Sequence, residues 1–252
     1  MKRLVVLGGG ESGVGTALLG KEKGFDVFVS DFGTLKKVYK DVLKHNEIEW
    51  EEGKHTASKI LNADVVMKSP GISEQVPIVK ALLETGISVI SEIEFAVQFT
   101  SADIIGITGS NGKTTTTMMT NHILNQAKFD VVMGGNIGDS FAGLIHKDPD
   151  YFVLELSSFQ LDGIINFRPH IAVLTNITPD HLDRYANKFE NYIASKFRII
   201  LNQTKQDYLI YDADDEVIST YLHTHPIQST LVPFSLTKTL AQGTYLNEKE
   251  II

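Results

Sequence analysis

The stretch that decides the fold of this chain is Asp103-Ile104-Ile105-Gly106-Ile107-Thr108-Gly109-Ser110-Asn111-Gly112-Lys113-Thr114-Thr115. A short apolar run leads into glycines, and the residues that follow have apolar side chains at helical spacing. This order predicts a phosphate-binding loop, because backbone N–H groups and a helix N-terminus converge on one anion. Lys113 is expected on the β- and γ-phosphates of a nucleotide and Thr114 on Mg²⁺. The spacing departs from the usual pattern at Ile107, where the first glycine would stand.

A second glycine-rich turn lies near the N-terminus. Gly8, Gly10 and Gly13 satisfy G-x-G-x-x-G after the apolar run 4–7, and Asp31 ends the next predicted strand. An acid about 20 residues beyond such glycines is typical of a dinucleotide-binding fold. The pattern alone leaves two interpretations open, which are NAD binding and a Rossmann-like turn that holds some other phosphate or none.

Strands and helices alternate along the whole chain. Predicted strands at 4–7, 25–31, 62–68 and 88–90 are separated by helices near 16–23, 35–45 and 77–84. This alternation predicts an α/β fold with parallel sheets covered by helices on both faces. The two phosphate-binding turns indicate two domains, a Rossmann-like one over residues 1–93 and a P-loop ATPase-type one over residues 94–252.

Further polar residues stand where predicted strands end, which is where α/β sheets bind ligands. Glu155 follows the strand 151–155 and suits a Mg²⁺ ligand, although capping or local pairing would also explain it. The loop after the strand 171–174 gathers charged residues around His181, which favours a site role over a structural one. Lys196, taken alone, is an ordinary surface lysine. The acidic run 212–215 predicts a helix cap rather than a metal site.

Composition excludes several classes of function. The chain has 252 residues, a net charge of −8 and no cysteine, so disulfides, thiolate metal sites and a cysteine nucleophile are ruled out. No block of basic residues stands out, which argues against a nucleic-acid surface. The apolar start is too short for a signal peptide or a membrane span. We therefore expect a soluble cytoplasmic protein with neither nucleic-acid nor membrane partners.

Four stretches together resemble the Mur ligases, which are ATP-dependent enzymes of peptidoglycan precursor synthesis. They are the phosphate loop 106–115, Gly135-Asn136-Ile137-Gly138, Glu155-Leu156-Ser157-Ser158-Phe159-Gln160-Leu161, and Asn176-Ile177-Thr178-Pro179-Asp180-His181-Leu182-Asp183-Arg184-Tyr185. The resemblance covers essentially the whole chain and explains the unusual loop spacing, which is the family's own variant. The run Ser157-Ser158-Phe159-Gln160 points to the D-glutamate-adding member of the family.

The resemblance implies roles for individual residues. The ATP phosphates would be bound by Gly109, Ser110, Asn111, Gly112, Lys113, Thr114 and Thr115. Two Mg²⁺ ions are implied, one held by Thr114 and Glu155, and the other by His181 and a carbamate on Lys196. The residues implied in catalysis are Lys113, His181 and Lys196. The UDP-sugar substrate would contact Ser12, Gly13, Ser69, Pro70, Gly71, Asn136 and Ser157.

The implied reaction is the addition of D-glutamate to UDP-N-acetylmuramoyl-L-alanine through an acyl phosphate formed with ATP. In this interpretation the N-terminal glycine turn holds UDP rather than NAD. Phe32 and Gly33 stand where some relatives place polar and basic residues against the nucleotide. The segment 244–252 predicts a β-hairpin whose second strand breaks off, so we expect a fragment that lacks the family's C-terminal domain and ligates poorly by itself.

Three alternatives remain open at this point. They are another amide ligase, such as a different Mur ligase or a folylpolyglutamate synthetase-like enzyme, a non-catalytic nucleotide-binding module, and an NAD-dependent oxidoreductase. The last leaves the second phosphate loop unexplained.

Overall fold

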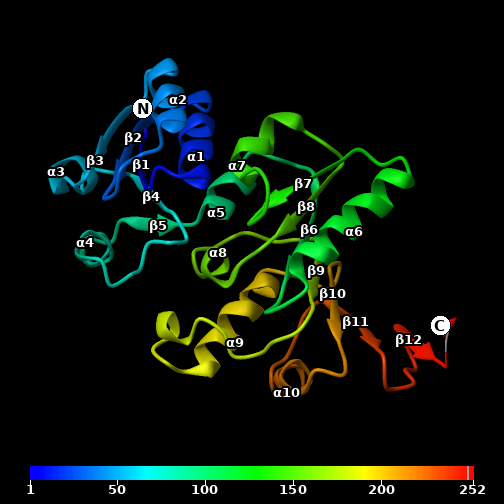
Figure 1. Cartoon of the computed structure of the whole chain (residues 1–252). Helices are drawn as coiled ribbons and strands as arrows, with labels where there is room; N and C mark the ends of the chain where they lie inside the picture. Colours follow the sequence, from blue (N-terminus) through cyan, green and yellow to red (C-terminus); the bar gives the residue numbers. More distant parts are fainter. Residues whose placement is uncertain (249) are drawn as a thin grey trace. The chain divides into compact units, whose positions relative to one another are not determined.

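The computed structural model describes residues 1–248 and 250–252 and contains two compact α/β units, as predicted (Figure 1). The first unit comprises Met1–Ser101, Ile137–Asp148 and Asp162–Ile165, and the second comprises Ala102–Asn136, Pro149–Leu161 and Asn166–Ile252. No single point in the sequence separates the two units, because residues 137–148 and 162–165 belong to the first unit. The predicted domain boundary after residue 93 stays a prediction.

The first unit is built on a five-stranded parallel sheet with the order β3-β2-β1-β4-β5 in the described residues. Its strands are β1 (Arg3–Leu7), β2 (Asp26–Asp31), β3 (Glu49–Glu52), β4 (Val65–Lys68) and β5 (Ser88–Ile90). The helices between them are α1 (Glu11–Glu22), α2 (Lys37–His45), α3 (Ala57–Ile60) and α4 (Pro77–Glu84). β3 was not predicted, because its acid-rich sequence Glu-Trp-Glu-Glu is atypical of a strand.

Helices cover both faces of this sheet. On one face Val5 and Leu7 pack with Ile60 of α3 and with Val79 and Leu82 of α4. On the other face α1 lies so close that a Cβ on Gly20 would come within 2.5 Å of Leu4. Successive residues of β1 therefore face opposite helix layers, because side chains alternate between the two faces of a strand.

Two buried carboxylates tie the later segments to the first unit. Helix α5 (Glu92–Val97) carries both of them. Glu92 Oε1 accepts a hydrogen bond from the backbone N–H of Ala142 at 2.6 Å, and Glu94 Oε2 accepts one from Ile165 at 2.8 Å. Ala142 belongs to α7 (Phe141–Leu144), which is followed by the short 3₁₀ helix η1 (Ile145–Lys147). Segments distant in sequence are thus fixed by backbone donors to buried acids.

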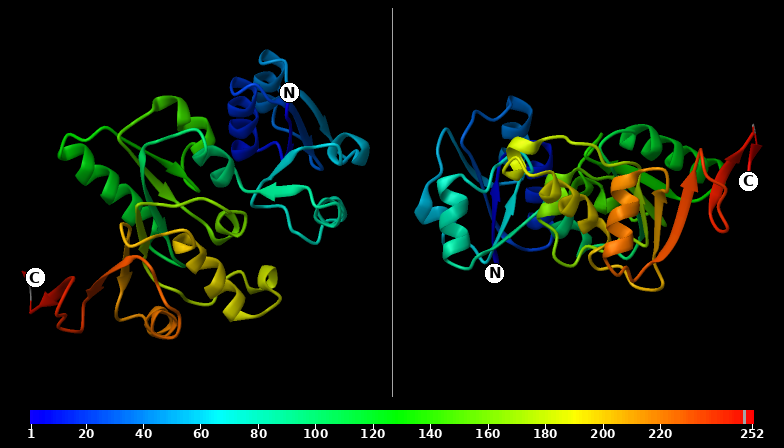
Figure 2. Two further views of the ribbon diagram at one scale, coloured as in Figure 1. Left: turned by 180° about the vertical axis from the view of Figure 1, so that it is seen from behind. Right: turned by 90° about the horizontal axis from the view of Figure 1, so that it is seen from below.

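The second unit contains an eight-stranded sheet with the order β13-β12-β11-β10-β9-β6-β8-β7 in the described residues. Its strands are β6 (Asp103–Thr108), β7 (Val131–Gly135), β8 (Tyr151–Glu155), β9 (Ile171–Leu174), β10 (Tyr208–Asp212), β11 (Thr230–Ser235), β12 (Thr244–Asn247) and β13 (Glu250–Ile251). All described pairings are parallel except β12 with β13, the predicted hairpin, which lies at one edge (Figure 2). β11, which contains Pro233, was not predicted.

Helices also cover both faces of the second sheet. Its helices are α6 (Lys113–Gln126), α8 (Ser158–Asp162), η2 (Leu182–Tyr185), α9 (Phe189–Phe197), η3 (Arg198–Ile200) and α10 (Glu216–Thr224). Leu124 of α6 packs on the face formed by Ile105, Ile107 and Val153. On the opposite face a Cβ on Gly106 would lie 3.4 Å from Ile199. In the described residues no helix is long and apolar enough to cross a membrane.

Each sheet has one point where its strand order reverses, between β1 and β4 in the first unit and between β6 and β9 in the second. Ligands of open α/β sheets bind outside the carboxyl ends of the strands at such points. The glycine turns after β1 and β6 lie at these two positions.

Candidate functional site

The predicted phosphate loop is a left-handed turn that opens helix α6. Gly109 has φ +150° and Gly112, at the helix N-cap, has φ +81°, both in the region that favours glycine. A Cβ on Gly109 would stand 1.9 Å from Thr175 Oγ1. Lys113 Nζ donates to the carbonyl oxygens of Gly109 and Ser110, each at 3.0 Å, so the ammonium lies against the loop where phosphates are expected.

Residues 175–178, which follow β9, hold this loop through hydrogen bonds from uncharged polar groups. Asn176 Oδ1 accepts from the Asn111 N–H at 2.9 Å, and Thr175 Oγ1 donates to the Asn111 carbonyl at 2.7 Å. Ser110 Oγ donates to the Thr178 carbonyl and accepts from the Thr178 N–H, both at 2.9 Å. The charged residues 180–184 are the more conspicuous part of this loop in the sequence, but the bonds to the phosphate loop come from residues 175–178. The signal for them was the polar Thr-Asn-x-Thr run directly after a strand.

Thr114 and Glu155 are brought together as predicted. Thr114 Oγ1 donates to Glu155 Oε2 at 2.7 Å, and Asn136 Nδ2 donates to Glu155 Oε1 at 2.7 Å. Glu155 is only 2% exposed, at the carboxyl end of β8 beside β6. A hydroxyl and a carboxylate at a phosphate loop are the hard oxygen donors that Mg²⁺ prefers, so these side chains fit one such ion.

Lys196 is not a surface lysine, because it is 2% exposed on α9. Its Nζ donates to Thr108 Oγ1 at 3.1 Å and lies 5.3 Å from the ring centroid of Tyr192. The Tyr192 hydroxyl lies 3.1 Å from Ser110 Oγ. Sequence reasoning missed Tyr192, which joins the lysine to the phosphate loop. Burial in this position depends on contacts that only the fold creates.

His181 lies in a different set of contacts. Its ring centroid is 5.0 Å from that of Phe159, its Nε2 is 3.4 Å from Asp180 Oδ2, and its side chain is half exposed. In the described part of the chain no hydrogen bond or ion pair joins His181 to Glu155. Residues 1–248 and 250–252 also contain no group of three His, Asp or Glu residues that could hold a metal ion. The second ion on His181 and Lys196 stays a prediction.

Ser157 closes the turn between β8 and α8. Its backbone N–H and its Oγ both lie 3.0 Å from Gln160 Oε1, to which both donate. Ser157 and Asn136 therefore flank Glu155 on the second unit, one following the acid in the chain and the other bonded to it. Their contact with a UDP-sugar stays a prediction.

In the first unit the two predicted substrate turns lie side by side, because β1 and β4 are neighbours. Gly8 has φ +93°, and a Cβ there would stand 2.6 Å from Ser69 Oγ. Ser69, Pro70 and Gly71 form the turn after β4, which the Ile72 N–H closes onto the Ser69 carbonyl at 3.0 Å.

The start of α1 carries the other two residues predicted in this turn. Only glycine fits at position 13, because a Cβ there would lie 1.8 Å from the Gly8 carbonyl oxygen. Ser12 lies in the first turn of α1, where its carbonyl accepts from Thr16 Oγ1 at 2.7 Å. The glycine pattern therefore reflects close packing of helix on strand as well as phosphate binding.

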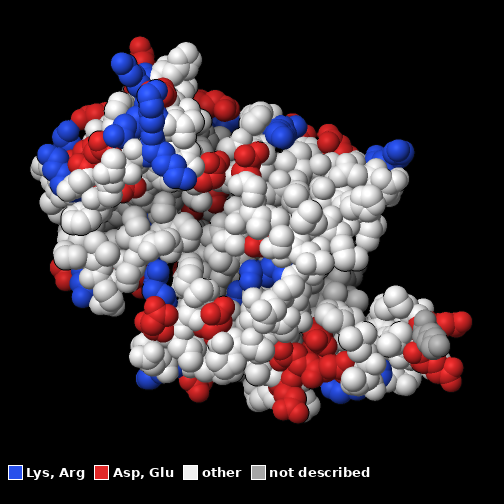
Figure 3. Space-filling view, viewed as in Figure 1, with Lys and Arg blue, Asp and Glu red and all other residues white. Residues whose placement is uncertain are grey.

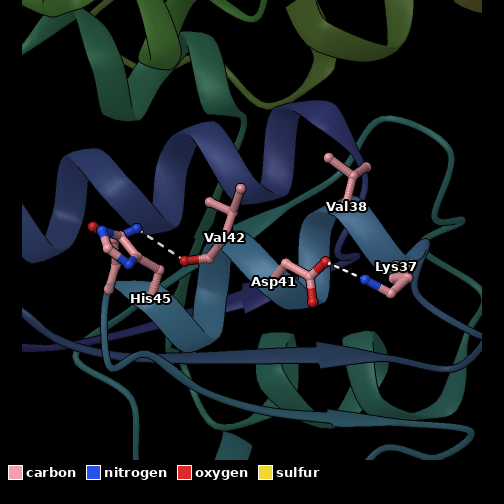
Figure 4. A pocket seen from close by; sticks show the side chains of 6 residues that line it. Lys37, Val38, Asp41, Val42 and His45 are labelled. Atoms are coloured by element: carbon pink, nitrogen blue, oxygen red, sulfur yellow. Dashed lines mark hydrogen bonds and ion pairs between the residues drawn. The ribbon is translucent and has the colours of Figure 1, made fainter.

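A hollow of about 540 Å³ lies on α2 of the first unit (Figure 4). It is lined by Lys37, Val38, Asp41, Val42, His45 and Asn46. It shares no residue with the predicted sites, and Lys37 and Asp41 within it pair with each other at 2.8 Å. This hollow is not the candidate site.

An acidic patch covers α10 and the end of β10 (Figure 3). Asp215 is the N-cap of α10 and accepts from the Ile218 N–H, as predicted, and its second oxygen accepts from the Ile177 N–H at 2.8 Å. Hydrogen bonds from the side chains of Thr237 and Ser235 lower the pKa of Asp214 to about 2. These acids are satisfied by protein donors, which supports the capping interpretation.

Two protein families match the chain. The Mur ligase middle domain matches residues 107–250, and the MurD N-terminal domain matches residues 3–78. The second match covers the N-terminal glycine turn, so that turn no longer favours a nicotinamide enzyme.

Curated relatives cover the whole chain. The UDP-N-acetylmuramoylalanine–D-glutamate ligase of Christiangramia forsetii is 59% identical over 252 residues, or 100% of this chain and 57% of that protein. The enzymes of that name from Bacteroides fragilis and Cytophaga hutchinsonii are each 52% identical over 253 residues. The chain thus spans less than two thirds of the length of these relatives.

Solved structures agree on the fold. The UDP-N-acetylmuramate:L-alanyl-gamma-D-glutamyl-meso-diaminopimelate ligase of Neisseria meningitides superposes with a TM-score of 0.66 at 20% identity, covering 97% of this chain and 83% of that one. The UDP-N-acetylmuramate–alanine ligase of Thermotoga maritima gives 0.57 at 22% identity, covering 94% of this chain and 53% of that one. Both likenesses confirm the predicted α/β architecture.

Proposed function

Since this chain belongs to the Mur ligase family, we propose that it supplies the nucleotide-binding units of an ATP-dependent ligase that adds D-glutamate to UDP-N-acetylmuramoyl-L-alanine. One observation carries the proposal. Glu155 joins the phosphate loop, through Thr114, to Asn136 of the motif expected to meet the substrate. In this proposal a single buried carboxylate would connect the ATP side of the chemistry to the acceptor side.

ATP is the phosphoryl donor in this proposal. Its phosphates would displace the contacts that Lys113 Nζ makes with the loop carbonyls, because a polyanion offers a stronger charge-assisted bond. The backbone N–H groups of the loop and the α6 N-terminus would hold the β- and γ-oxygens. The hydrogen bonds from residues 175–178 would keep the loop in this shape before ATP binds.

UDP-N-acetylmuramoyl-L-alanine is the acceptor, with its diphosphate on the turns after β1 and β4. Those turns present Ser12 and Gly13 at the start of α1 and Ser69, Pro70 and Gly71 at the end of β4. Adjacent turns at the point of strand reversal are where a Rossmann-like sheet binds a diphosphate. The same proposal includes a cytoplasmic location, because a ligase that consumes ATP must work in the compartment that supplies it.

The reaction has two steps that balance as written. The alanine carboxylate oxygen attacks the γ-phosphorus of ATP, the bond to the β–γ bridging oxygen breaks, and an acyl phosphate and ADP form. The amine of D-glutamate then attacks the acyl carbon, loses a proton, and expels inorganic phosphate as the amide bond forms. The chain contributes positioning, which can supply roughly 7–11 kcal/mol, and the cationic charge of Lys113 near the transferred phosphoryl group.

Mg²⁺ would be held by Thr114 and Glu155, and when bound it would neutralise charge on the phosphates. We further propose that His181 and a carbamate on Lys196 serve a second ion. A carbamate forms by CO₂ addition to a neutral amine and turns a cation into an anion. The burial of Lys196 next to Thr108 and Tyr192, the latter bonded to Ser110 of the phosphate loop, supports this proposal.

A thermal-shift panel tests the proposal on this chain. We expect UDP-N-acetylmuramoyl-L-alanine and Mg²⁺-ATP each to raise the melting temperature, since ligands that bind only the folded state stabilise it. NAD⁺ and UDP-N-acetylmuramoyl tripeptide should give little or no shift at the same concentration. D-Glutamate-dependent phosphate release, measured with other amino acids as comparators, tests the second step. A larger shift with another acceptor, or release that favours another amino acid, would refute the assignment.

A further inference from the structure

Helix α9 contacts the phosphate loop through two side chains one helical turn apart. Lys196 Nζ donates to Thr108 Oγ1 at 3.1 Å. The Tyr192 hydroxyl lies 3.1 Å from Ser110 Oγ. Residues 192 and 196 share one face of α9, because positions four apart in a helix are neighbours on its surface. Lys196 has a role in the proposed function, whereas Tyr192 has none so far.

The Tyr192 side chain is enclosed by other rings. It is 1% exposed, and its ring centroid lies 5.5 Å from that of Tyr185 and 6.4 Å from that of Phe189. A buried phenol hydroxyl costs free energy unless it finds a hydrogen-bond partner. The Tyr192 hydroxyl finds one in Ser110, 82 positions away in sequence. Phenylalanine would fill the same space without needing a partner, so packing alone does not explain a tyrosine here.

The direction of this hydrogen bond follows from the other contacts of Ser110. The Ser110 hydroxyl donates its single hydrogen to the Thr178 carbonyl and accepts from the Thr178 N–H, both at 2.9 Å. One lone pair of Oγ is left, because a hydroxyl has one donor and two acceptor sites. Tyr192 therefore donates to it. Burial raises the pKa of Tyr192, which keeps the phenol protonated at neutral pH.

Ser110 connects the Tyr192 hydroxyl to the candidate nucleotide site. Its carbonyl oxygen accepts from Lys113 Nζ, the cation expected on the phosphates, at 3.0 Å. The peptide groups of Asn111 are held as well, since its N–H and its carbonyl bond to Asn176 at 2.9 and 3.0 Å. The three hydrogen-bonding sites of the Ser110 hydroxyl are all used within the protein. This side chain therefore shapes the loop, and only the backbone of Ser110 is left to meet a phosphate.

We propose that Tyr192 is a positioning residue for nucleotide binding, whose hydroxyl holds Ser110 so that the phosphate loop needs no rearrangement when the phosphates arrive. The inference rests on the proposed function, which brings ATP to this loop. Groups that already have their bound geometry cost less free energy on binding. Without the hydroxyl, a buried acceptor site of Ser110 loses its donor, and the loop is held less firmly in the binding shape.

The test uses Tyr192→Phe, which removes only the hydroxyl, together with Ser110→Ala and the double variant. Tyr185→Phe is the matched control, because Tyr185 is also buried and its hydroxyl lies 3.1 Å from Ser195 Oγ of α9. The whole chain is titrated calorimetrically with β,γ-methylene-ATP and Mg²⁺, an analogue that cannot transfer its γ-phosphate. The melting temperature without ligand reports stability, and a titration with UDP reports on the first unit.

We expect Tyr192→Phe to weaken binding of the ATP analogue about three- to ten-fold, which is the effect of one hydrogen bond. Adding Tyr192→Phe to Ser110→Ala should cause little further loss, because both changes remove the same bond. Tyr185→Phe should lower the melting temperature but bind the analogue like the wild type. UDP binding should be equal in all variants.

Three results would overturn the inference. The first is equal affinity of the wild type and Tyr192→Phe for the ATP analogue. The second is an additive loss in the double variant, which would mean that the two hydroxyls act independently. The third is a loss in Tyr185→Phe as large as that in Tyr192→Phe, which would assign the effect to the general packing of α9.

A parallel titration with UDP-N-acetylmuramoyl-L-alanine separates this inference from the proposed function. If the wild type binds both compounds and Tyr192→Phe binds the ATP analogue equally well, the inference fails while the proposed function stands. If the analogue binds in a Tyr192-dependent manner but the muramoyl compound does not bind, the proposed acceptor fails while the positioning role stands. No binding of the analogue by the wild type would overturn both.

Discussion

Asp207 offers the sharpest test of the physical reasoning about the second unit. Its side chain is 1% exposed and lies just before β10. The guanidinium of Arg168 donates to both of its oxygens, at 2.7 and 3.1 Å, and Thr204 donates from its backbone N–H and its hydroxyl. His170 Nδ1 lies 3.3 Å from Oδ1. The change to make is Asp207→Asn, which keeps the shape and removes the charge.

The magnitude follows from the pKa. Burial by itself would raise the pKa of Asp207, but the hydrogen bonds from Arg168 and Thr204 outweigh it and lower the pKa from 3.8 to about 2. A shift of this size corresponds to about 2 kcal/mol of folding free energy at neutral pH. Because the folded-state pKa is depressed, this contribution is complete above pH 3.8 and is lost as the pH falls toward 2.

The assay is urea denaturation of the wild type and Asp207→Asn between pH 7 and pH 2.5. Far-UV circular dichroism follows the whole chain, while Trp50, the single tryptophan, follows the first unit as an internal control. We expect Asp207→Asn to lower the free energy of unfolding of the second unit by about 2 kcal/mol at pH 7, and the difference to be roughly halved near pH 3. Asp103→Asn, which alters an exposed acid at the start of β6, should have little effect.

Two results would refute this reasoning. A difference between the wild type and Asp207→Asn that stayed constant from pH 7 to pH 3 would mean that the carboxylate charge is not what stabilises the segment. A difference below about 0.5 kcal/mol at pH 7 would place Asp207 with ordinary surface acids, whose ion pairs contribute little.

Three further predictions concern the phosphate loop and the glycine turn. Lys113→Ala should remove most of the rise in melting temperature that Mg²⁺-ATP gives, because the ammonium no longer binds the phosphates, and an unchanged rise would remove the lysine from the phosphate site. Thr114→Val should raise the Mg²⁺ concentration needed for half-maximal ATP binding while Thr114→Ser should not, and equal behaviour of the two variants would argue against the hydroxyl as a ligand. Gly13→Ala should destabilise the first unit by about 1–3 kcal/mol, because its Cβ would overlap the Gly8 carbonyl, and Trp50 fluorescence in urea should report the loss.

The sequence by itself determined the features that depend on neighbouring residues. Apolar periodicity and glycine spacing located the strands before both turns, the helix opened by Lys113, and the acid that ends β8. These features are local, because a strand-to-helix turn restricts which residues can follow one another. The resemblance to the Mur ligases rested on the same local motifs and was confirmed by the family matches.

Only the tertiary structure decided how distant segments meet. It buried Lys196 against Thr108, 88 positions away in sequence, and it placed Tyr192 on Ser110. It also joined residues 137–148 and 162–165 to the first unit through Glu92 and Glu94. The neighbouring sequence does not show that a lysine or a glutamate will be buried. The free-energy cost of burying its charge is offset only by partners that other parts of the chain supply on folding.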